Sequence, residues 1–68
     1  MDKRKLAMLQ SSLLKRGLRL VTATKQSAAR WSAWQDAVHR HNRIGHLTNA
    51  QAESILTMIS NARRRVRH

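Results

Sequence analysis

The chain has 68 residues, of which fourteen are Lys or Arg and three are Asp or Glu, so its formal net charge is +11 at pH 7. This length supports one domain with a marginal core, so we expect a single small helical domain over residues 1–68 that gains stability by self-association. The sequence has no Cys, which excludes disulfides and thiolate metal ligands and fits a reducing compartment. Three carboxylates cannot neutralise fourteen cations, so the charge predicts a polyanionic partner.

Neither a membrane span nor a signal peptide is expected. No run of about 18 uncharged apolar residues occurs. Lys15, Arg16 and Arg19 interrupt the apolar pattern of the first third, whereas a signal peptide needs an uninterrupted apolar stretch followed by a cleavage site. We therefore expect a cytoplasmic protein.

The first third of the chain is ambiguous between helix and strand. Four leucines recur at helical spacing and predict a helix from about residue 2 to 16: Leu6, Leu9, Leu13 and Leu14. Gly17 is a candidate for its end. The segment 18–22 is partly alternating and ends in β-branched residues, which fits a short strand or a helix that continues into the next element. Because helical propensity around this segment is high, we favour a helix.

A middle helix is predicted from apolar residues that recur on one side: Ala28, Trp31, Trp34, Ala37 and Val38. Three residues are candidates for its N-cap: Thr22, Thr24 and Ser27. Gly45 is the expected C′ residue beyond its end. The short loop that follows predicts a helical hairpin with the last element.

The last element is predicted to be a helix over about residues 49 to 66. Thr48 is a good N-cap, and Gln51 lies three residues later, which is the spacing of a capping box. One apolar stripe follows at helical spacing: Ala52, Ile55, Leu56, Ile59, Ala62 and Val66. The main prediction is therefore an all-α unit of two or three helices that forms a dimer.

Residues 18–66 resemble a ribbon-helix-helix protein in the order of their elements: an Arg-bearing segment, a helix, a glycine turn and a capped helix. In that family the strand pairs with its twin and reads the major groove. The resemblance implies this role for Arg19, with Leu18, Leu20 and Thr22 beside it. A dimer of this kind, with a strand near 18–22, is the alternative to the all-α prediction.

The candidate site residues are the cations at both chain ends and around Gly17: Lys3, Arg4, Lys5, Lys15, Arg16, Arg19, Arg63, Arg64, Arg65 and Arg67. Ten of the fourteen cations are Arg, whose planar fork suits phosphate. We interpret residues 63–68 as a basic C-terminal tail. Its charge points to several sides of a helix, which favours attachment to phosphates over base readout.

Two further groups of side chains are weighed as sites. Trp31 and Trp34 are the only aromatic residues other than His and suit either stacking on bases or a core pair; without Phe or Tyr, we predict the core pair. His39, His41 and His46 lie near the end of the middle helix without metal-binding spacing or a neighbouring carboxylate. We therefore predict no metal site and no cofactor.

Little in the sequence suits catalysis. Beyond residue 2 the acidic side chains are Asp36 and Glu53, and neither a nucleophile elbow nor a phosphate loop occurs. We predict a non-enzymatic nucleic-acid-binding protein, for DNA or RNA, that acts as a small regulatory or accessory factor. Two alternatives stay open: a helical interaction module or inhibitor that docks on a larger protein complex, and a cationic amphipathic peptide that acts on membranes.

Overall fold

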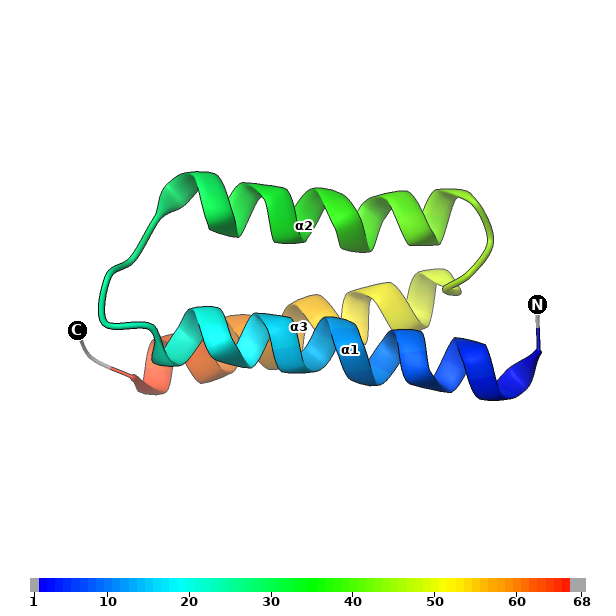
Figure 1. Ribbon diagram of the computed structural model, residues 1–68, viewed down its shortest axis with the longest axis horizontal. Helices are drawn as coiled ribbons and strands as arrows, with labels where there is room; N and C mark the ends of the chain where they lie inside the picture. Colours follow the sequence, from blue (N-terminus) through cyan, green and yellow to red (C-terminus); the bar gives the residue numbers. More distant parts are fainter. Residues whose placement is uncertain (1, 67–68) are drawn as a thin grey trace.

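The computed structural model describes residues 2–66, which form three α-helices. They are α1 (Lys3–Thr22), α2 (Ala28–Arg43) and α3 (Asn49–Arg65). Figure 1 shows that α2 runs antiparallel to the other two, so α1 and α3 point the same way along a body of 38 × 18 × 17 Å. The prediction of an all-α unit of two or three helices is confirmed, with three helices and no strand within residues 2–66; dimerisation stays a prediction.

The strand considered over residues 18–22 is wrong, and so is Gly17 as a helix end. α1 continues through Gly17 to Thr22. The helical register places Leu13, Gly17 and Val21 on one buried stripe, and this packing outweighs the local β-propensity of the segment. The resemblance to ribbon-helix-helix proteins therefore fails at the strand on which it depends.

Gln26 links the end of α1 to the start of α2. Its Nε2 donates to the carbonyls of Leu20 at 3.2 Å and Ala23 at 2.9 Å. Its Oε1 accepts a hydrogen bond from Trp31 Nε1 at 2.9 Å. Ser27 caps α2, since its hydroxyl accepts a backbone N–H from the first turn. Ser27 is thus the correct one of the three cap candidates, and the alternative of one continuous helix is wrong.

Gly45 is the C′ residue that follows the C-cap of α2, as predicted. Its φ is +86°, a left-handed conformation that glycine adopts without steric cost. The His46 N–H donates to the His41 carbonyl at 2.9 Å, and the Gly45 N–H donates to the Asn42 carbonyl at 3.2 Å. This pair of bonds is a Schellman motif, which satisfies the last carbonyls of α2.

The capping box at the start of α3 is confirmed. The Thr48 hydroxyl accepts from the Gln51 N–H at 3.1 Å, and Gln51 Oε1 accepts from the Thr48 N–H at 2.9 Å. Two orphan donors of the helix start are satisfied in this way. α3 ends at Arg65 with Val66 as its C-cap, one residue from the predicted boundary.

The core lies between the three helices and includes the tryptophan pair. Its buried members are Leu13, Val21, Trp31, Trp34, Val38, Leu47, Ala52, Ile55 and Ile59. Trp31 is 5% and Trp34 2% exposed, and their rings meet edge to face with centroids 6.1 Å apart. Trp34 Nε1 donates to the Leu13 carbonyl at 2.9 Å, so its polar group is satisfied inside the core. The predicted core pair is confirmed.

Gly17 allows α2 and α3 to approach α1 closely. A Cβ atom there would lie 2.7 Å from Ile59 Cγ1 and 2.8 Å from Trp34 Cζ2. Neither distance is tolerated, and the Trp34 ring is rigid and enclosed. Packing, not helix termination, therefore explains this glycine.

We predict that Gly17→Ala lowers the free energy of unfolding by about 2 kcal/mol, because overpacking strains the core and displaces the Trp34 hydrogen bond. Urea denaturation would measure the loss. At an exposed helix position the same change stabilises by about 1 kcal/mol. A stabilised Gly17→Ala variant would show that no close approach exists.

We predict that Thr48→Ala lowers the free energy of unfolding by about 1 kcal/mol, because the capping box is lost. Thr57→Ala, at an exposed position inside the same helix, is the matched control and should leave stability unchanged or slightly raised. Thermal melts followed by circular dichroism would compare the two. Equal melting of both variants would mean that the cap contributes nothing.

Candidate nucleic-acid interface

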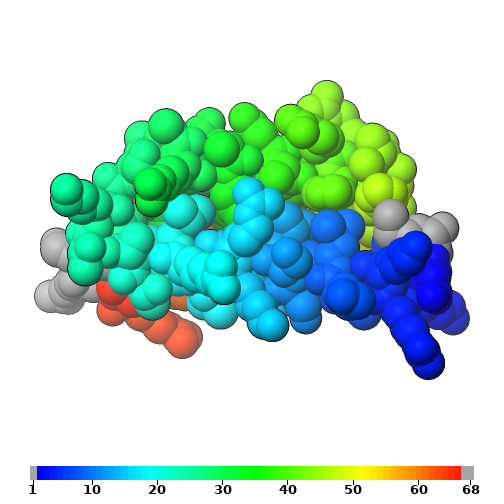
Figure 2. All heavy atoms as spheres, viewed as in Figure 1, coloured from blue at the N-terminus to red at the C-terminus, as the bar shows by residue number. Residues whose placement is uncertain are grey.

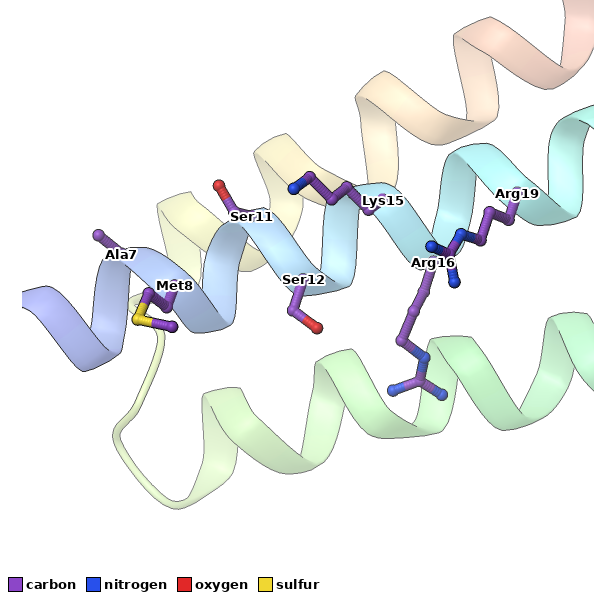
Figure 3. Close-up of a pocket in the computed structure, with 7 residues that line it drawn as sticks. All are labelled: Ala7, Met8, Ser11, Ser12, Lys15, Arg16 and Arg19. Atoms are coloured by element: carbon purple, nitrogen blue, oxygen red, sulfur yellow. The ribbon is translucent and has the colours of Figure 1, made fainter.

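The outward side of α1 is strongly basic. The helix carries six cations and no carboxylate. Its solvent side forms a shallow depression of about 530 Å³, drawn in Figure 3. We call its lining residues the α1 face: Ala7, Met8, Ser11, Ser12, Lys15, Arg16 and Arg19. The face combines three cations and two hydroxyls with Ala7 and the exposed Met8, and no acidic side chain belongs to it.

The side chains of the α1 face divide between two edges of the helix. Figure 3 shows Ser12 and Arg16 on the edge toward α2, with Ser11 and Lys15 on the opposite edge. Lys and Arg are donors only, and Ser hydroxyls both donate and accept. Such a surface suits a ligand rich in acceptor oxygens, such as a phosphate backbone.

A second, smaller hollow lies between α1 and α2. We call it the α1–α2 groove; it has a volume of about 260 Å³ and is lined by Arg16, Arg19, Leu20, Arg30, Ala33 and Trp34. Arg16 and Arg19 therefore belong to both surfaces. Arg30 was not among the predicted site residues, because only the pairing of α1 with α2 brings it to them. Its place in the first turn of a helix, where a cation opposes the dipole, was the available signal.

The predicted site residues do not form one cluster. Lys3, Arg4 and Lys5 lie at the N-terminal end of α1. The stretch 63–65 lies at the far end of the molecule, beside the α1–α2 connection (Figure 1). Figure 2 shows α1 along the front of the molecule, between these two ends. Arg67 lies outside the described residues.

The cations of the described chain have no acidic partners within it. Within residues 2–66 no Lys or Arg side chain forms an ion pair. Asp2, Asp36 and Glu53 are all exposed, and Asp2 serves as the N-cap of α1. The counter-charges for this surface must therefore come from solution or from a ligand.

Arg63 has a structural role that sets it apart from its neighbours. Its guanidinium carbon lies 4.4 Å from the centroid of a Trp31 ring, a cation–π contact that joins the end of α3 to the start of α2. Arg64 and Arg65 are exposed and suit the negative end of the α3 dipole. Of these three predicted site residues, Arg63 is therefore the one whose side chain is already engaged in a contact within the protein.

Two of the histidines contact one another. Nδ1 of His41 and Nδ1 of His46 lie 3.2 Å apart, so one ring donates to the other. Beside them, Asn42 Nδ2 donates to the Leu47 carbonyl at 3.0 Å. Within residues 2–66 no group of three or more His, Asp or Glu side chains is placed to hold a metal ion. The absence of a metal site stays a prediction.

Comparison with known proteins gives no relative. No protein-family model, curated protein or solved structure matches the chain. In the part of the chain that the structure describes, no helix has both the length and the apolar character needed to span a membrane.

We predict that Arg63→Ala lowers the free energy of unfolding by about 0.5–1 kcal/mol through loss of its contact with Trp31. Arg64→Ala removes the same charge from the next residue and should change stability less. Chemical denaturation of the two variants side by side would separate the ring contact from general charge effects. Identical stabilities would remove the structural role assigned to Arg63.

Proposed function

We propose that the protein is a non-enzymatic nucleic-acid-binding protein, a regulatory or accessory factor that holds phosphates with the α1 face. One observation carries the proposal: α1 carries six cations with no carboxylate of its own, and three of them, Lys15, Arg16 and Arg19, lie in the α1 face. No ion pair within residues 2–66 neutralises them. Phosphates of DNA or RNA supply the missing counter-charges, and release of their condensed counterions drives binding.

The positions of the cations support a ligand at α1 in particular. A cation near a helix C-terminus is stabilised by the helix dipole, by about 0.3–1 kcal/mol, and one near the N-terminus is correspondingly disfavoured. The dipole of α3 therefore stabilises Arg64 and Arg65, which lie in its last turn. The dipole of α1 disfavours Lys3 and Arg4, which lie in its first turn. An anionic partner gives these residues a favourable role that the isolated fold does not.

The length of the basic surface favours a polymer over a small anion. At about 1.5 Å per residue, a helix of this length extends over roughly 30 Å. The cations of α1 fall in two groups, at residues 3–5 and 15–19, separated by the uncharged residues 6–14. A nucleic acid offers phosphates at intervals over such a distance, whereas a single small anion meets only a few cations at once.

The alternatives that dock an apolar helix face on a protein or a membrane are less well supported. The apolar stripes of α1 and α3 are used inside the molecule, since Leu13, Val21, Ile55 and Ile59 are each at most 3% exposed. Presenting these stripes to a partner would require the helices to separate. The basic surface needs no such rearrangement.

We predict that the double variant Lys15→Gln, Arg19→Gln weakens binding to duplex DNA, because two phosphate contacts are lost. The slope of log affinity against log salt concentration should become shallower by about 1.8. Fluorescence anisotropy over a salt series would measure affinity and slope together.

The matched control is Arg40→Gln, Arg43→Gln, which removes two charges from α2 residues that do not line the α1 face. It should leave most of the affinity and the salt slope in place. If the two double variants weaken binding equally, overall charge and not the α1 face determines affinity. If the unmodified protein binds no nucleic acid at low salt, the proposed function is wrong.

A further inference from the structure

We propose that the α1–α2 groove receives one unpaired base of a single-stranded nucleic acid, while the three arginines around it hold the flanking phosphates. These arginines are Arg16, Arg19 and Arg30. The inference rests on the proposed function and narrows its ligand from nucleic acid in general to single strands.

Three of the six residues that line the groove are apolar, which phosphate binding alone does not require. They are Leu20, Ala33 and Trp34; Ala33 is exposed and Leu20 is half-buried. A base presents a flat apolar face that packs on such a surface, and the guanidinium planes of Arg offer further stacking partners. The combination of apolar and cationic lining residues matches a nucleotide, whose base is apolar on its faces and whose phosphates are anionic.

The groove is preformed and small. Trp34 is held by its hydrogen bond to the Leu13 carbonyl and is 2% exposed. Its ring is therefore fixed in position and contributes only a small surface to the groove. The volume of about 260 Å³ lies below the roughly 300–1,000 Å³ of sites for drug-sized ligands. A group no larger than one base fits this space without a rearrangement of the core.

The groove gathers positive charge from two helices. Arg16 and Arg19 come from α1, and Arg30 comes from the first turn of α2. The lining residues include no carboxylate, and none of the three arginines forms an ion pair within residues 2–66. Arginine forks bind phosphate oxygens in pairs. Phosphates on either side of an inserted base would therefore meet a guanidinium.

The shape of the groove selects against duplex nucleic acid. A base inside a duplex is stacked and paired, so its face reaches a protein hollow only after costly extrusion. Bases of a single strand are already free to turn outward. The groove therefore predicts tighter binding of single strands than of duplexes at equal salt.

The first test compares three labelled oligonucleotides of about 12 nucleotides, a length within the site sizes of single-strand binders: a thymidine strand, an abasic strand of equal length, and a duplex. The abasic strand keeps the phosphates and lacks the bases. We expect the thymidine strand to bind about tenfold or more tightly than the abasic strand, and more tightly than the duplex.

The second test fills the groove without a change of charge. Ala33→Leu should abolish the preference for thymidine over the abasic strand and leave affinity for the abasic strand unchanged. Ser32→Leu adds a similar apolar side chain at a neighbouring exposed position outside the groove and should retain the preference. Thermal melts would verify that both variants fold; since both sites are exposed, we expect melting temperatures close to that of the parent.

The outcomes separate the two proposals. Equal affinity of the parent protein for thymidine and abasic strands overturns the base site and leaves phosphate binding standing. Tighter binding of the duplex overturns the preference for single strands. If the Ala33→Leu variant keeps the full preference for the thymidine strand over the abasic strand, the base binds elsewhere and the inference is also overturned. If the protein binds none of the three oligonucleotides, the proposed function itself is overturned.

Discussion

The structure depends on the contact that Trp34 makes with α1 across Gly17. Because residue 17 has no side chain, the indole reaches the α1 backbone and donates to the Leu13 carbonyl at 2.9 Å. Ile59 of α3 packs against the same residue, so all three helices meet at one point. In a small chain without disulfides, such a contact fixes the helices relative to one another. It also sets the α1–α2 groove, since Arg16 precedes Gly17 and Trp34 lines the groove.

The charge of the molecule works against this small core. A net charge of +11 on 68 residues repels itself and destabilises the compact state. A polyanion that binds the folded chain removes part of this repulsion, and mass action then stabilises the fold. The excess of cations is thus costly to the free protein and favourable in a complex. This contrast argues for a role of the charge in binding.

Several features that were predictable from sequence depend only on near neighbours. The capping box of Thr48 and the turn at Gly45 need only residues within one helical turn, and both occur as expected. Gly17 was misread because its role depends on Trp34 and Ile59, which come from the other two helices. A glycine followed by β-branched residues favours a break locally, and only tertiary packing overrules it.

The same limit applies to the candidate site. Six cations and no carboxylate on α1 are visible in the sequence, as is the basic run after residue 62. Their grouping is not, because it depends on how the helices pair. Arg30 joins Arg16 and Arg19 only across the α1–α2 contact, and Arg63 meets Trp31 only where α3 ends beside α2. Composition predicts the kind of partner, and packing determines which cations lie near one another.

In the proposed complex, affinity and base preference arise from different parts of one surface. Arg16 and Arg19 belong both to the α1 face and to the α1–α2 groove, so a strand along α1 passes the groove without leaving its phosphate contacts. Lys15, on the edge of α1 away from α2 (Figure 3), contributes charge alone. Ala33 contributes contact area and no charge. Gly17 allows α1 and α2 to pack closely beside these residues. In the proposed complex, the distance between the bound phosphate and the bound base is therefore set by the packed core and not by a flexible loop.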